Sequence, residues 1–158
     1  GKEDMKKDDY RPVMASSAIP VVCRPVKIKG IPYYDGGIAD AIPVRHALEA
    51  GCERLVVILS KQRDYVRKPQ GMRFLYSRIC RRYPKIVEAI DRRHITYREN
   101  LEDVFELERQ GKAFVFAPSE PVKVGTYTMD EKVERELYDL GWKDFKDRKD
   151  DLRKFMEQ

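Results

Sequence analysis

The chain has 158 residues, enough for one ordinary domain with a sizeable core, and we predict a single domain over residues 1–158. Hydrophobic residues make up 42% and charged residues 37%, a balance typical of a compact core that carries long, charged surface helices. No apolar run approaches the roughly 20 residues of a membrane span, and the charged start does not look like a signal peptide.

The three cysteines, Cys23, Cys52 and Cys80, are widely spaced and form no C-x-x-C or Cys/His ligand pattern. We therefore expect reduced, buried thiols in a cytoplasmic protein, and no metal site built from them.

The first part of the chain predicts a short helix, a hairpin and a β-α-β unit. A helix over residues 14–18 is stopped by Pro20, and Lys29-Gly30 is a two-residue turn between two short strands. A helix from Pro43 is closed by Gly51 before the continuous apolar run of residues 55–59. Residues 33–59 are therefore expected to form a parallel β-α-β unit that helices cover on both sides.

The second part is mostly helical. We predict helices over 71–82 and 85–110, a buried strand over 113–117, and a capping box at Thr128-Met129-Asp130-Glu131. That box opens a helix that ends near Gly141, and a charged amphipathic helix follows over 142–156. The fold class is α/β, with helices packed on a mostly parallel sheet. The core β-α-β lies in residues 10–60 and a helical extension in residues 71–158.

The segment Tyr33-Tyr34-Asp35-Gly36-Gly37 predicts the end of a strand, followed by an acidic residue and a turn with two glycines. The two glycines let the backbone turn through positive φ, which leaves the carboxylate of Asp35 at a sheet edge. In an open α/β sheet, ligands bind beyond the carboxyl ends of the strands, so Asp35 is a candidate site residue. A purely structural Asx-turn is the alternative.

Together with Ala15-Ser16-Ser17-Ala18-Ile19-Pro20, Pro43 and Gly51, this segment resembles the C-terminal half of a patatin-like phospholipase. The similarity runs over most of residues 10–158 and is greatest to bacterial members with an extended helical C-terminus. It implies a three-layer patatin-like fold with extra C-terminal helices. It also implies a lipid acyl hydrolase that works with a Ser–Asp dyad, in which Asp35 is the catalytic aspartate and Gly36 and Gly37 line the site. No metal or organic cofactor is implied.

The family also needs a glycine-rich oxyanion loop and a G-x-S-x-G nucleophile elbow, and none of the nine glycines forms either one. We therefore expect a fragment that carries half of a catalytic site and is inactive alone. A missing N-terminal half or another copy of the chain would complete it. An aspartate that acts directly on serine must be desolvated, because a carboxyl with a pKa of about 3.9 is a poor base at neutral pH. Tyr33 or Tyr34 would supply that environment.

Other polar residues have simpler interpretations. Asp40, the rival acid, is expected to cap the helix that follows. Ser16 and Ser17 lack a nucleophile elbow. Ser60 and Ser119 are expected to form turns after strands.

The two histidines have no acid or cysteine partner at a recognisable spacing. His46, in the first turn of the helix after Asp35, is expected at most to support that residue indirectly. His94 follows two arginines on a charged helix and is expected to be solvated.

Nine basic residues and one acid lie between Lys61 and Lys85, while the rest of the chain is net acidic. Aromatic side chains interleave with them, at positions Tyr65, Phe74, Tyr76 and Tyr83. This mixture fits a peripheral contact with anionic lipid, a surface for single-stranded nucleic acid, or a solvated face opposite the acidic residues 99–108. We place nucleic acid behind lipid, because the stretch begins at the edge that carries Asp35. A non-catalytic basic module for anionic lipid or nucleic acid is the alternative to the acyl hydrolase.

Overall fold

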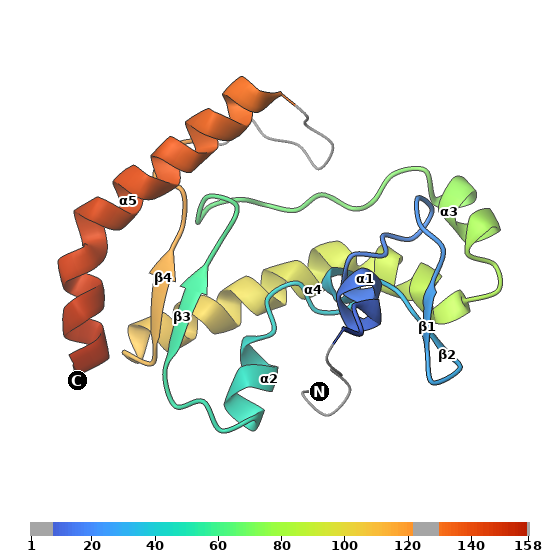
Figure 1. The fold of residues 1–158 in the computed structure, drawn as a ribbon, viewed down its shortest axis with the longest axis horizontal. Coiled ribbons are helices and arrows are strands. Elements are labelled where there is room, and N and C mark those ends of the chain that lie inside the picture. Colours follow the sequence, from blue (N-terminus) through green and yellow to red (C-terminus); the bar gives the residue numbers. More distant parts are fainter. Residues whose placement is uncertain (1–7, 122–129, 158) are drawn as a thin grey trace. The chain divides into compact units, whose positions relative to one another are not determined.

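The computed structural model describes residues 8–121 and 130–157, which form two compact units (Figure 1). The first unit comprises Gly1–Pro43 and Arg67–Leu101, and the second comprises Val44–Val66 and Glu102–Gln158. Both are mixtures of helices and small sheets, so the predicted α/β class is confirmed at that level.

The first unit contains α1 (Arg11–Ser16), a hairpin of β1 (Val26–Ile28) and β2 (Ile31–Tyr33), the 3-10 helix η2 (Gly36–Ile38) and α3 (Arg73–Ile79). The predicted two-residue turn is confirmed: Lys29 and Gly30 have φ angles of 49° and 82°. Positive φ at both central positions matches the right-handed twist of the flanking strands. The register that results pairs Ile28 with Ile31.

Helix α4 (Pro84–Arg109) runs through the first unit as far as Leu101 and continues in the second. Its start at Pro84 agrees with the expected break, because proline suits the first turn of a helix. In the first unit Ile38, Tyr76 and Ile90 are buried together, and Ile86 and Val87 pack against them.

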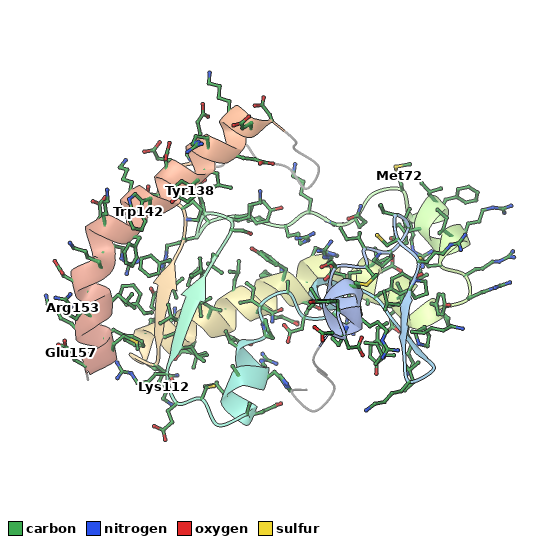
Figure 2. All side chains as sticks on the ribbon, viewed as in Figure 1. Met72, Lys112, Tyr138, Trp142, Arg153 and Glu157 are labelled. Carbon is green, nitrogen blue, oxygen red and sulfur yellow. The ribbon has the colours of Figure 1, made fainter. Side chains whose placement is uncertain are left out.

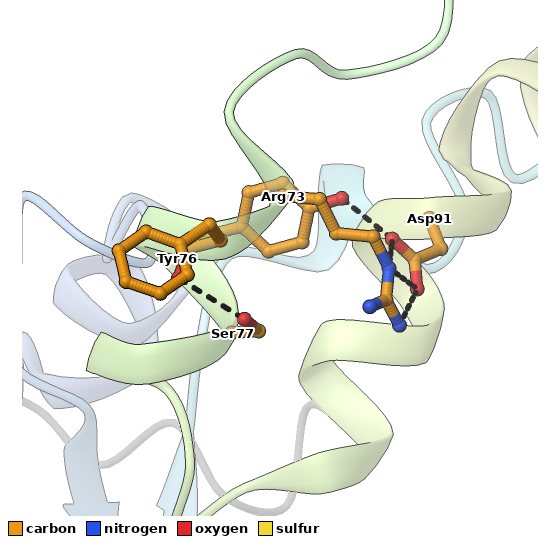
Figure 3. Close-up of polar contacts among 5 residues, drawn as sticks. Arg73, Tyr76, Ser77 and Asp91 are labelled. Carbon is orange, nitrogen blue, oxygen red and sulfur yellow. Dashed lines mark hydrogen bonds and ion pairs between the residues drawn. The ribbon is translucent and has the colours of Figure 1, made fainter.

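The short helix α3 is fastened to α4 by one carboxylate (Figure 3). Asp91 accepts a hydrogen bond from the Tyr76 hydroxyl at 2.5 Å and pairs with the Arg73 guanidinium at 3.0 Å. The bond from Tyr76, supported by Arg73, lowers the pKa of Asp91, whereas burial and the same bond raise the pKa of Tyr76. Both directions favour an ionised Asp91 carboxylate and a Tyr76 hydroxyl that keeps its proton.

The second unit contains α2 (Val44–Glu49), a sheet of β3 (Leu55–Ile58) and β4 (Ala113–Phe116), and α5 (Glu131–Glu157). The two strands are parallel, with Leu55 opposite Ala113 and Ile58 opposite Phe116 (Figure 1). The predicted β-α-β unit over residues 33–59 is wrong, because β2 pairs antiparallel with β1 and β3 pairs with β4. A local hairpin satisfies β2, and a long helical crossover supplies the parallel partner of β3.

One of the two faces of the sheet in the second unit is only partly covered. Phe114 and Phe116 on β4 pack against Phe155 and Phe145 of α5 at ring distances of 5.7 and 6.2 Å. On the same face of β3, Val56 and Ile58 are 44% and 79% exposed. Coverage by helices on both sides of the sheet was therefore predicted wrongly for β3.

Helices α2 and α4 end in the same way. Gly51 has φ of 90°, its N–H donates to the Leu48 carbonyl at 2.9 Å, and the next residue bonds the carbonyl of Ala47. Gly111, with φ of 70°, repeats both bonds after α4. These are Schellman ends, and glycine is favoured because its backbone enters the left-handed region without a Cβ clash.

Helix α5 differs from the prediction at its start and its middle. It begins at Glu131, where the Asp130 carboxylate accepts hydrogen bonds from the N–H groups of Lys132 and Val133 at 2.9 and 3.4 Å. The first residues of the predicted capping box, Thr128 and Met129, lie outside the described residues. The helix then passes through Gly141 without a break, because one glycine costs only about 1 kcal/mol in a long helix. Across the described ranges, no helix is long and apolar enough to cross a membrane.

Candidate active site at the Asp35 turn

The carboxylate of Asp35 lies in a tight turn directly after β2. The N–H of Gly37 donates to Oδ1 at 2.8 Å, and the N–H of Ile38 donates to the backbone carbonyl of Asp35 at 3.3 Å. Within residues 8–121 and 130–157, Oδ2 has no hydrogen-bond partner, and the side chain is half-buried. The Asx-turn therefore forms, but it engages only one oxygen. The other oxygen can still accept a proton.

Gly36 and Gly37 do not adopt the positive φ angles that we predicted. Both lie in η2, and the described glycines with positive φ are Gly30, Gly51 and Gly111. The constraint at Gly37 is space, because a Cβ there would lie 3.3 Å from Oδ1 of Asp35. A Cβ at Gly36 would have nothing within 4 Å.

The two motifs that carry the resemblance are hydrogen-bonded to each other. The N–H of Asp35 donates to the carbonyl of Ala18 at 3.0 Å, and Ala15 and Ala18 are both buried. Ser16 and Ser17 are exposed at the end of α1, where Ser17 is the C-cap. The alanine motif thus supports the backbone from which the Asp35 side chain projects.

Two side chains of α4 hold the same turn, and sequence reasoning missed both of them. Nε of Arg93 donates to the carbonyl of Gly37 at 3.1 Å. Nδ2 of Asn100 donates to Oδ1 of Asp40 at 2.6 Å and to the carbonyl of Ile42 at 3.0 Å. Arg93 and Asn100 are seven residues apart and therefore share one face of the helix.

One signal could have identified Asn100. It lies within the apolar stripe of α4, beside Tyr97, Leu101 and Val104, and it is only 7% exposed. A buried amide is retained where it meets hydrogen-bond partners. No comparable signal marks Arg93, because α4 carries many exposed arginines.

Asp40 does not cap α2 as predicted. The helix begins at Val44, so its N-cap position is Pro43, three residues after Asp40. The Asp40 carboxylate instead accepts from Asn100. The second acid of the segment is thus a structural link between this loop and α4.

Of the two tyrosines expected to shield Asp35, only Tyr34 packs inward. Its ring meets Tyr83 edge-on at 5.7 Å, and burial, with contributions from Cys80 and Tyr83, raises the pKa of Tyr34. Tyr33 is exposed.

Asp35 was predicted to lie beyond the carboxyl end of a strand in an open, mostly parallel sheet. That prediction is wrong, because β2 belongs to a separate antiparallel hairpin. The carboxyl ends of β3 and β4 do share an edge. Ser60 is exposed at that edge, and the backbone N–H of Ser119 donates to Asp144 at 3.0 Å.

The histidines and cysteines also differ from expectation. His46 has an acid partner after all, since its Nδ1 lies 3.7 Å from Glu49. His94 was expected to be solvated, but it is half-buried, and its buried Nδ1 has no hydrogen-bond partner among the described residues. The cysteines, expected to be buried, are split: Cys80 is buried, and Cys23 and Cys52 are exposed. The described residues contain no group of His, Cys, Asp or Glu side chains placed to hold a metal.

The basic stretch divides into two parts. Arg63 pairs with Glu108, as expected of a face that meets the acidic residues 99–108. Arg67 lies over the ring of Tyr97, which is outside that segment. Arg78, Arg81 and Arg82 are exposed, and the part of the chain that the structure describes gives them no ion pair.

Comparison with known proteins separates the chain into two segments. Residues 10–48 match the family of patatin-like phospholipases, and residues 83–157 match a domain of unknown function, DUF6363. The uncharacterized protein YjjU of Escherichia coli (strain K12) is 40% identical over an alignment of 79 positions, and the match covers 41% of this chain. The chain spans 22% of the length of that relative. No solved structure matches significantly. The Asp35 turn lies in the patatin-like segment, and the residues that hold it from α4 lie in the other.

Proposed function

We propose that this chain supplies the aspartate of a Ser–Asp dyad in a lipid acyl hydrolase. The observation that carries the proposal is the state of the Asp35 carboxylate. One of its oxygens is held by Gly37, and the other has no partner among the described residues, in a segment similar to patatin-like phospholipases. A general base needs this combination of fixed position and open lone pair.

The chemistry requires a serine from outside these residues, because the sequence contains no G-x-S-x-G. That serine would attack the acyl carbonyl while its proton passes to Oδ2 of Asp35. The proton would then move to the leaving alcohol, and the acyl-serine would be hydrolysed by water with Asp35 again as base. Oxyanion donors would also come from elsewhere.

The serine and the oxyanion donors would come from a further part of the protein or from another copy of the chain. Either source would complete a site of which this chain provides the Asp35 turn.

The test is hydrolysis of a p-nitrophenyl acyl ester by this chain and by the longest product of its gene. We expect turnover in the longer protein alone and a loss of at least about a hundredfold with Asp35→Asn, the range for a missing general base. Retained turnover in Asp35→Asn would exclude the role. Activity in this chain alone would place the nucleophile among its own serines, and activity in neither would contradict a hydrolase.

A matched glycine pair sharpens the test. Gly37→Ala should lower turnover because its Cβ would crowd Oδ1 of Asp35, whereas Gly36→Ala should retain it. Equal activity of the two variants would show that the close approach at Gly37 does not matter for the reaction.

A further inference from the structure

Four large apolar side chains at α3 are exposed to solvent. The exposed fractions are 74% for Met72, 79% for Phe74, 40% for Leu75 and 50% for Ile79. Met72, Leu75 and Ile79 follow one another at intervals of three and four residues, so they line one side of the helix. Figure 2 shows Met72 projecting away from the ribbon. Phe74 adds a fourth exposed apolar side chain to the same short helix. Large apolar side chains that stay exposed together mark an interaction surface.

The outward orientation of these side chains is fixed from the opposite face. Tyr76 and Cys80 are buried, and Asp91 holds Tyr76 and Arg73 on α4 (Figure 3). If α3 rolled to bury Phe74, it would break these bonds and expose Cys80. The exposure of the apolar side is therefore built into the docking of the helix.

Basic side chains border the apolar ones. Arg78 lies one turn after Phe74, and Arg81 and Arg82 follow in the tight turn that leads to α4. All three are exposed, and they form no ion pair within residues 8–121 and 130–157. We call these three arginines and the four apolar residues the α3 surface.

We propose that the α3 surface docks on an anionic lipid bilayer. The apolar side chains would enter the boundary between headgroups and acyl chains, and the arginines would meet lipid phosphates and carboxylates. Charge complementarity selects this occupant, because a positively charged rim around aliphatic groups is the complement of an anionic membrane.

Two other occupants fit less well. Single-stranded nucleic acid requires rings for base stacking, but Tyr76 is buried and Tyr83 packs on Tyr34, so Phe74 is the one well-exposed ring of the α3 surface. A second copy related by a twofold axis would bring like-charged arginines together across the interface. The inference does not depend on hydrolysis, since it concerns binding alone.

The experiment is co-sedimentation of the whole chain with phosphatidylcholine vesicles, with and without phosphatidylserine. We expect binding only to the anionic vesicles and weaker binding as salt is raised. Each arginine near the surface contributes about fivefold in affinity, so the triple change Arg78→Gln, Arg81→Gln and Arg82→Gln should weaken binding about a hundredfold. Phe74→Ser should weaken it about tenfold or more.

Matched controls come from α5. Changing Lys132, Arg135 and Lys149 to Gln removes the same charge from another exposed surface, and Tyr138→Ser removes another exposed ring, which Figure 2 shows on that helix. Both controls should bind vesicles like the unaltered chain, and so should Asp35→Asn. That last variant separates this proposal from the hydrolase, because it should lose turnover in the longer protein and retain binding.

Three results would overturn the proposal. The first is equal binding to neutral and anionic vesicles, or none. The second is equal loss in the α5 controls. The third is that the α3 changes abolish self-association, or binding of single-stranded RNA, while vesicle binding is absent.

Discussion

At the scale of the residue, the Asp35 turn depends on contacts that come from far along the chain. Asn100 bridges Asp40 and Ile42 from a buried position. Removing a buried donor leaves its acceptors without partners, which usually costs more than the hydrogen bond contributed.

We predict that Asn100→Ala lowers the free energy of unfolding by about 1–3 kcal/mol, measured by urea denaturation. Glu99→Ala, an exposed neighbour on α4, should stay within about 0.5 kcal/mol. Asn100→Asp should be worse than alanine at neutral pH, because a carboxylate would face Asp40. Its deficit should shrink as acid protonates the pair, since the new acid would have a raised pKa in the folded state. A pH-independent deficit would contradict this contact.

The sequence was informative about Asp35 but not about what surrounds it. The run of strand end, acid and glycines is local, so the position of the turn was predictable. The donors from Arg93 and Asn100 are about 60 residues away and depend on how α4 packs, which no local pattern encodes. The role of Gly37 was also misjudged, because steric room around a carboxylate is not visible in a dipeptide.

At the scale of the element, the backbone conformation of a glycine shows whether a helix ends there. Gly111 closes α4 with a left-handed backbone, whereas Gly141 lies inside α5 with nothing within 4 Å of the position of a Cβ. Their substitution by alanine should therefore act in opposite directions.

We expect Gly141→Ala to raise the free energy of unfolding by about 1 kcal/mol, the difference in helix propensity. Gly111→Ala should lower it by about 1–2 kcal/mol, because an L-residue is strained in that conformation. Thermal and urea unfolding of both variants would measure the effects. A stabilised Gly111→Ala, or a destabilised Gly141→Ala, would mean that the helix ends are placed wrongly.

Elements with local signals were well predicted, and their pairing was not. The hairpin, α2, α4 and the two apolar strands follow from turn residues and periodicity. The parallel pairing of Leu55 with Ala113 spans 58 residues of chain and competes with a local hairpin at β2, so sequence order alone assigned the wrong partner.

At the scale of the whole molecule, the exposed part of the β3 face is a liability for the isolated chain. Val56 and Ile58 lie beside the part that α5 covers. An exposed apolar face at an unpaired strand edge favours association.

We predict concentration-dependent self-association of this chain in sedimentation equilibrium, weakened strongly by Ile58→Lys. Met156→Lys, which adds the same charge at an exposed position of α5, should associate like the unaltered chain. Association that is unaffected by Ile58→Lys would show that another surface holds the copies together.

The hydrogen bond between Asn100 and Asp40 limits how segments of this chain can be exchanged with those of relatives. It joins the segment similar to patatin-like phospholipases to the segment of unknown function, so the two are not interchangeable modules. A chimera that takes its C-terminal segment from a relative should keep its stability only where the donor also provides an amide for Asp40 and a cation for the Gly37 carbonyl. The practical crossover point for such chimeras is therefore defined by these contacts rather than by the boundary between the two family matches.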